Sequence, residues 1–126
     1  MRTHEEAILE FFSKMDIEML DTFLDMPNYQ DLPKQTFIKK LEIAFKKLQR
    51  SGDTYLSRFP GTCKGGCGNK GARGWVFIGN YSGRQMHLVT LVDNGRITDM
   101  FDCFNFQSPK AKSGCRKVFI NDLFNP

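Results

Sequence analysis

The stretch MHLVTLVDNGRITDMFDC, residues 86–103, decides the fold of this chain. Two runs rich in apolar and β-branched residues flank the turn sequence Asp93-Asn94-Gly95-Arg96. Asn-Gly is typical of a two-residue hairpin turn, because both positions need a positive φ. The stretch therefore predicts two antiparallel strands, over residues 86–92 and 97–106.

A two-residue turn at Asn94-Gly95 also predicts which residues oppose each other. One face of the sheet would hold three opposed pairs: Val92 with Ile97, Leu88 with Phe101, and Met86 with Cys103. The other face would hold a cross-strand pair of His87 and Asp102. Both faces are rich in apolar residues, so we expect cover on both sides or a second copy of the chain on one of them.

Helical periodicity precedes this hairpin. Apolar residues at helical spacing predict a helix over about residues 4–14, which begins at a capping box of Thr3 and Glu6. A second helix is expected from the N-cap Asp16 to just before Pro27. A third is expected from Pro33, with Gly52 directly after its end.

The rest of the chain predicts shorter strands. They are expected over residues 55–59 and 75–78, with a last edge strand over 118–120, and a loop rich in glycine and cysteine over 61–74. The expected fold is α+β in a single domain, residues 1–126, with a helical part over 1–52 and a sheet part over 53–126. Three N-terminal helices would pack on a four- to five-stranded antiparallel meander sheet. This order of elements resembles that of small NTF2-like or cystatin-like domains.

Composition narrows the class of protein. The chain has 126 residues, 40% of them hydrophobic, which suits one packed domain. No apolar run approaches the roughly 20 residues of a membrane-spanning helix. The N-terminal segment brings acidic residues at once and shows no apolar signal-peptide core. We therefore expect a cytoplasmic protein whose thiols are reduced.

The cysteines predict a metal site. Cys63 and Cys67 form a Cys-x3-Cys motif in the glycine-rich loop, a spacing that lets two thiolates reach one zinc ion. Cys103 and Cys115 would supply the third and fourth ligands of a structural zinc. His87 is an alternative to Cys115, but the register above places His87 and Cys103 on opposite faces. Free thiols, disulfides and a redox dithiol stay open as alternatives.

Several of these residues also carry a family resemblance, covering about residues 1–106. Gly61-x-Cys63, Cys67, Gly74-Trp75-x-Phe77, Ile97-Thr98-Asp99, Cys103 and Phe106 resemble the pattern of small uncharacterised bacterial proteins with a Cys-Gly-rich loop. No activity is assigned to that family. The resemblance implies that Cys63, Cys67 and Cys103 act as a unit, and it leaves Cys115 outside.

The net charge of +4 is unevenly distributed. Residues 1–32 carry two basic and eight acidic residues, whereas residues 33–50 carry six basic and one acidic residue. The expected third helix therefore presents a basic surface made of Lys39, Lys40, Lys46, Lys47 and Arg50. Such a surface attracts phosphates, so polyanion or nucleic-acid binding is one functional hypothesis. The alternative is a solvated helix face whose charges pair with the acidic helix before it.

The function expected first is non-enzymatic binding of a small molecule, another protein or a second copy of the chain, at the helix–sheet cleft or on a sheet face. Zinc would stabilise the glycine-rich loop of such a module. A further hypothesis is an NTF2-like enzyme or ligand carrier in which Asp102 orients His87 for acid–base chemistry. The sequence places no Ser or Cys nucleophile beside that pair.

Overall fold

The computed structural model of the chain describes residues 3–63, 71–103, 106–107 and 117–121. Three helices come first, as the periodicity predicts: α1 (His4–Ser13), α2 (Ile17–Phe23) and α3 (Lys34–Arg50). The side chains of Thr3 and Asp16 cap α1 and α2, accepting hydrogen bonds from the amides of Glu6 and Met19. Gly52 follows the C-cap of α3 with φ +99°, the left-handed conformation that glycine adopts at least cost.

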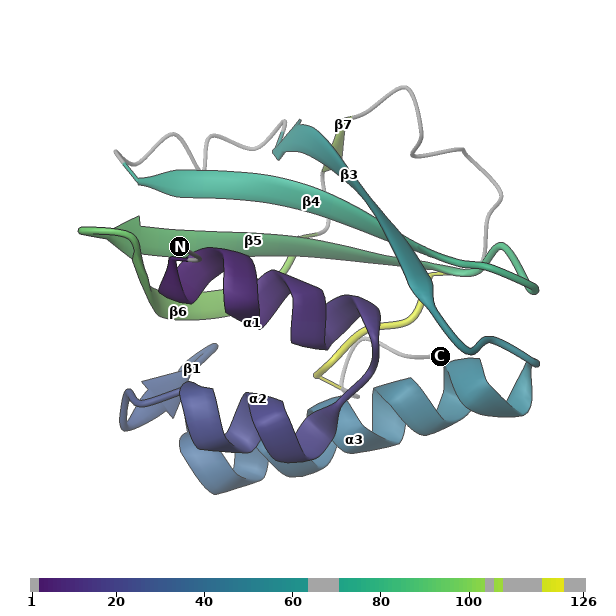
Figure 1. Cartoon of the computed structure of the whole chain (residues 1–126), viewed down its shortest axis with the longest axis horizontal. Coiled ribbons are helices and arrows are strands. Elements are labelled where there is room, and N and C mark those ends of the chain that lie inside the picture. Colours follow the sequence, from purple (N-terminus) through teal and green to yellow (C-terminus); the bar gives the residue numbers. More distant parts are fainter. Residues whose placement is uncertain (1–2, 64–70, 104–105, 108–116, 122–126) are drawn as a thin grey trace.

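The main sheet is antiparallel, with its strands in the order β6-β5-β4-β3-β7. The strands are β3 (Leu56–Cys63), β4 (Ala72–Gly79), β5 (Gln85–Asp93), β6 (Arg96–Asp102) and the short β7 (Phe106–Gln107). The predicted α+β class, with N-terminal helices on an antiparallel sheet, is confirmed (Figure 1). Both ends of the loop expected over 61–74 belong to strands, because β3 continues to Cys63 and β4 begins at Ala72, and residues 64–70 lie outside the described residues.

A second, smaller sheet lies between α2 and α3, where the sequence predicts neither a helix nor a strand. β1 (Asn28–Tyr29) and β2 (Leu32–Pro33) form a two-stranded hairpin between α2 and α3. Its two turn residues, Gln30 and Asp31, both have positive φ, at 52° and 57°. That backbone matches the mirror-image turn of tight hairpins, which sequences more often build with Asn and Gly. The hairpin was therefore missed because its turn residues are atypical.

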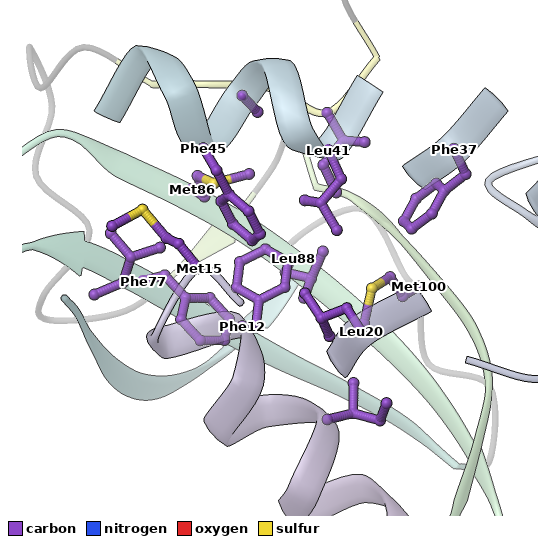
Figure 2. Close-up of a cluster of buried hydrophobic side chains, with 14 of the residues drawn as sticks. Phe12, Met15, Leu20, Phe37, Leu41, Phe45, Phe77, Met86, Leu88 and Met100 are labelled. Atoms are coloured by element: carbon purple, nitrogen blue, oxygen red, sulfur yellow. The ribbon is translucent and has the colours of Figure 1, made fainter. Parts of the chain in front are cut away.

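The helices cover one face of the main sheet, and the core lies between them (Figure 1). Aromatic rings from two helices and the sheet meet there: Phe12 of α1 lies 5.0 Å from Phe45 of α3 and 4.4 Å from Phe77 of β4, measured between ring centroids. Figure 2 shows these rings beside Met86, Leu88 and Met100 of the sheet. The buried phenylalanines, which are Phe12, Phe37, Phe45 and Phe77, thus serve packing.

A β-bulge changes the register of the β5–β6 hairpin. The two-residue turn at Asn94-Gly95 is present, and Val92 opposes Ile97 as predicted. Between Leu91 and Val92 the register then shifts by one residue, so that Leu88 opposes Asp102 and Val89 opposes Phe101. The predicted pairs Leu88–Phe101, Met86–Cys103 and His87–Asp102 are therefore wrong.

Burial explains this bulge. Ile97 and Met100 are both buried in the helix-side core, although they are three residues apart and a regular strand alternates every two. Thr98 is the extra residue, and its Oγ1 donates a hydrogen bond to the carbonyl of Leu91 at 3.4 Å. The bulge thereby turns Met100 inward and, two residues later, Asp102 as well.

The segment at residues 117–121 is not the edge strand that was predicted. Lys117 forms a single parallel bridge with Gln85, and the amide of Val118 donates to the carbonyl of Gln85 at 2.8 Å. Val118 and Ile120 then leave the sheet and bury their side chains in the helix-side core. Among the described residues, no helix is long and apolar enough to cross a membrane.

Candidate functional site

A cleft of about 520 Å³ lies where three distant segments meet at the β6 edge of the sheet. The turn of the β1–β2 hairpin forms one wall, the second half of β6 forms another, and the 117–121 segment closes the end. The lining residues are Gln30, Asp31, Leu32, Asp99, Phe101, Asp102 and Asn121. We call this site the β6 cleft.

Asp102 is the structural centre of the β6 cleft. Its Oδ1 accepts a hydrogen bond from the amide of Ile120 at 2.8 Å. Its Oδ2 accepts from the amide of Asn121 at 3.0 Å and from Nε2 of Gln30 at 2.9 Å. Burial raises the pKa of the Asp102 carboxyl, and the hydrogen bonds from Asn121, Ile120 and Gln30 oppose that rise. One carboxylate thus joins the small hairpin, β6 and the 117–121 segment.

Asp99 makes a second link to the small hairpin. Its Oδ1 accepts hydrogen bonds from the amides of Gln30, at 3.0 Å, and Met100, at 2.8 Å. Gln30 is thereby held at both its backbone and its side-chain Nε2. Its Oε1 is buried, yet within the described part of the chain it accepts no hydrogen bond. Among the described residues, the cleft therefore contains an acceptor that lacks a donor.

The cleft combines negative charge with apolar surface. Asp31, at the exposed hairpin turn, adds a third carboxylate to those of Asp99 and Asp102. Phe101 and Leu32, both partly buried, supply the apolar part of the lining. The set of acceptors suits N–H donors that carry positive charge, and an aromatic ring stabilises a cation that lies over its face.

His87 and Asp102 lie on opposite faces of the sheet, so the acid–base pair suggested by the sequence does not form. Asp102 opposes Leu88 of the helix-side core, whereas His87 opposes Val76 on the other face. Nε2 of His87 lies 2.8 Å from Oε1 of Gln85, and burial, followed by the charge of Lys117, lowers the pKa of His87 to about 4. The imidazole is therefore neutral at physiological pH.

The bulge also brings His87 and Cys103 to the same face. The amide of Cys103 donates to the carbonyl of His87 at 2.9 Å, and both residues are buried within the single chain. The register argument against His87 as an alternative ligand to Cys115 is therefore wrong. Val76 and Val89 are buried on this face too.

The predicted cysteine site lies partly outside the described residues. The backbone of Cys63 ends β3 and pairs with Phe106 of β7, while Cys103 is buried. Cys67 and Cys115 fall in segments that the structure does not describe. Among the side chains that are described, no group of three or more His, Cys, Asp or Glu residues is arranged to hold a metal ion.

The basic residues of α3 follow the predicted stripe. Lys39, Lys46 and Arg50 are exposed, and Lys40 and Lys47 are partly buried. Charge pairing with α2 is present at the start of the helix, where Nζ of Lys34 lies 3.4 Å from Oδ1 of Asp21. Lys39 also lines a groove shared with the acidic residues Glu18 and Asp21 of α2. The two ends of α3 therefore differ in their electrostatic surroundings.

Sequence reasoning missed the β6 cleft because it depends on the bulge and on the small hairpin. One signal was available: Ile97 and Met100 are apolar at a spacing of three inside a predicted strand, which indicates a bulge. Gln30 and Asn121 gave no comparable signal, since their positions follow from tertiary contacts alone.

Comparisons of the chain with protein-family models, with curated proteins and with solved structures found no match.

Proposed function

We propose that this chain is a non-enzymatic ligand-binding module and that the β6 cleft takes a small organic cation, an ammonium or guanidinium group with an apolar part. The observation that carries the proposal is a cleft lined by three carboxylates that also contains an acceptor without a donor among the described residues. Two of the carboxylates, those of Asp99 and Asp102, are held in place by hydrogen bonds, and Oε1 of Gln30 is buried without a donor from the described residues. A bound N–H donor would satisfy that oxygen.

The absence of the expected acid–base pair supports a binding role over catalysis. His87 and Asp102 are separated by the sheet, and the carboxylate of Asp102 is engaged by three donors. These donors come from the small hairpin and from the 117–121 segment. The carboxylate therefore links both segments to β6. The remaining acceptors in the cleft can orient a ligand by hydrogen bonds, as in most small-molecule sites.

The test is calorimetric titration of the full chain with benzamidine and butylamine as cations and with benzoate as the anion of similar shape. We expect both cations to bind and benzoate not to bind. Asp99→Asn removes one charge from the cleft and keeps an acceptor oxygen, so it should weaken cation binding about tenfold. The matched control is Asp93→Asn, an exposed acid on the same hairpin but outside the cleft. Equal binding of benzoate, or equal effects of both variants, would contradict the proposal.

We also propose that Cys63, Cys67 and Cys103, with Cys115 or His87, bind a structural zinc ion in this module. Chain connectivity supports the grouping, because Phe106, which pairs with Cys63, is only three residues from Cys103. A chain of three residues spans at most about 11 Å, which keeps Cys103 near the end of β3. Zinc would then link β3 to the end of β6.

Polyanion binding through α3 is a second candidate function. It is favoured by one observation, the exposure of Lys39, Lys46 and Arg50 along one helix. Binding of heparin in low salt that weakens as salt is raised is the expected behaviour. Binding that ignores salt, or that survives charge reversal at Lys39, Lys46 and Arg50, would exclude this function.

A further inference from the structure

The C-terminal end of α3 packs against the turn between β4 and β5. Nη1 of Arg84, after the turn, donates to Oγ of Ser51 at 2.9 Å. The amide of Asn80, at the start of the turn, donates to the carbonyl of Tyr55 at 3.0 Å. Figure 1 shows the end of α3 and this turn at the same end of the molecule. The side chains defining this α3–turn surface are Lys46, Lys47, Arg50, Tyr55 and Tyr81.

Tyr81 is the more exposed of the two aromatic rings on this surface. It is 80% exposed, although tyrosine usually buries much of its ring. The turn nevertheless fixes its position. Its amide donates to Oδ1 of Asp53 at 2.8 Å, and its ring touches Gly52, where a Cβ atom would lie only 2.7 Å from Cδ2. The ring is thus held at the end of α3 with most of its surface open to solvent.

One acidic group, Asp53, lies beside this ring and holds the turn in place. Asp53 is buried, and its carboxylate accepts hydrogen bonds from the amides of Tyr81 and Ser82 and from the hydroxyl of Ser82. The positive charge of Arg84 also acts on it. The side chains of Lys46 and Arg50 are exposed on the preceding helix turns, and Tyr55 adds a second aromatic ring that is 39% exposed.

The exposed cations of α3 and the positioned Tyr81 ring after its C-terminal end match the two requirements of a single nucleic-acid strand, which presents phosphates and unpaired bases. We propose that the α3–turn surface binds single-stranded nucleic acid, with Lys46, Lys47 and Arg50 on the phosphates and a base stacked on Tyr81. The proposal rests on the polyanion function above and narrows it in two ways. It confines the contact to the C-terminal half of α3, and it adds a stacking contact that a simple polyanion site lacks.

Helix stability gives a second reason for basic residues at this end, since Lys47 and Arg50 lie in the last turn, where cations interact favourably with the helix dipole. That reason does not account for Tyr81. A ring that served packing alone would be covered by neighbouring side chains, whereas this one is supported on one side by Gly52 and is otherwise open. Tyr81 is therefore the residue on which the test depends.

The experiment measures fluorescence anisotropy of a labelled 12-nucleotide oligothymidine with the full chain, at salt concentrations from about 50 to 200 mM. We expect binding whose logarithm falls with the logarithm of salt, with a slope of about −2 for three phosphate contacts. Tyr81→Ala should weaken binding about tenfold, and Tyr81→Phe should stay within about twofold because phenylalanine also stacks. The double variant Lys46→Glu/Arg50→Glu should abolish most binding, whereas Lys39→Glu, at the acidic groove, should not change it.

The outcomes separate this inference from the broader polyanion function. If heparin and the oligonucleotide compete equally and Tyr81→Ala has no effect, the surface is a simple polyanion site and the stacking contact is excluded. If Lys39→Glu weakens binding as much as the double variant does, the whole helix binds and the confined surface is wrong. If neither the oligonucleotide nor heparin binds at 50 mM salt, both proposals fail. Preference for duplex over single strand would also overturn the inference.

Discussion

The carboxylate of Asp102 accepts a hydrogen bond from the backbone amide of Ile120, 2.8 Å away, and this contact anchors the 117–121 segment beneath the sheet. The same carboxylate holds Gln30 of the small hairpin, so residues from three distant parts of the chain meet at one side chain. A buried carboxylate loses stability when one of its donors is removed. Asp102 therefore holds the walls of the β6 cleft together.

Replacing Asp102 by Asn should destabilise the fold. The amide side chain keeps one acceptor oxygen but turns an N–H2 group toward donors that now lack a partner. We expect a loss of about 1–3 kcal/mol in the free energy of unfolding, measured by urea denaturation. Asp93→Asn, at an exposed position on the same hairpin, should change it by less than about 0.5 kcal/mol. Similar values for the two variants would show that the hydrogen bonds of Asp102 do not stabilise the fold.

Much of the fold could be predicted from the sequence because its signals are local. The caps at Thr3 and Asp16, the glycine after α3 and the Asn94-Gly95 turn each act within a few residues. The bulge at Thr98 is different, since it depends on which side chain the helices can bury. Because the bulge at Thr98 was not predicted, Asp102 and Cys103 were each assigned to the wrong face of the sheet.

The candidate site could be predicted less well for the same reason. His87 and Asp102 were assigned to one face because a regular register was assumed, and the bulge separates them. The β6 cleft needs Gln30 beside Asp99 and Asp102, which are about 70 positions further along the chain, and local patterns do not report such contacts. The exposed stripe on α3, by contrast, follows from helical spacing alone and is present as predicted.

Asp53 should contribute stability that depends on pH. Burial alone would raise its pKa, but hydrogen bonds from the hydroxyl and amide of Ser82 and the amide of Tyr81, with the charge of Arg84, lower it below the ordinary value of 3.8. The unfolded chain therefore takes up a proton first as the pH falls. This contribution is complete above the unfolded pKa and is lost as the pH falls through the lower folded pKa.

Asp53→Asn should lower the free energy of unfolding by about 1–3 kcal/mol at pH 7. The same variant should flatten the fall in stability as the pH drops below the unfolded pKa, because the titrating group is gone. Urea denaturation at a series of pH values gives both quantities, with Asp93→Asn as the control for removal of an exposed charge. A variant whose profile runs parallel to that of the original chain would disprove this role.

Gly52 and Gly83 allow backbone strain to be separated from collision with Tyr81. Both have positive φ, at 99° and 72°, but only at Gly52 would a Cβ atom meet the Tyr81 ring, while nothing lies within 4 Å at Gly83. Gly83→Ala should therefore cost about 1 kcal/mol, and Gly52→Ala should cost more. Adding Tyr81→Ala to Gly52→Ala should recover the difference. Equal melting temperatures for the two alanine variants would show that the ring is not held against Gly52.

The zinc proposal predicts one zinc per chain in protein purified under reducing conditions. Metal analysis and a thiol count in denaturant, both on one sample, distinguish the alternatives. Zinc gives stoichiometric metal and four thiols, disulfides give fewer thiols and no metal, and free cysteines give four thiols without metal. Cys63→Ser should remove the metal and lower the melting temperature. Protein without stoichiometric zinc, combined with an unchanged melting temperature for Cys63→Ser, would reject the site.

Cys115→Ser then identifies the fourth ligand. If this variant keeps its zinc while His87→Ala loses it, His87 completes the site with Cys103 on the same sheet face. If Cys115→Ser loses its zinc, the four-cysteine site predicted from the sequence is correct. Retention of zinc by both variants would mean that neither residue is a required ligand and that the site is held by Cys63, Cys67 and Cys103 with another partner.

The β6 cleft is tested most directly by a residue-resolved NMR titration of the full chain with benzamidine. The proposed function predicts that the amide signals of Gln30, Asp99 and Asn121 shift together and saturate with one dissociation constant, and that Asp99→Asn weakens that constant about tenfold. Shifts confined to the groove between α2 and α3, or no saturable shift in the cleft at millimolar benzamidine, would contradict it.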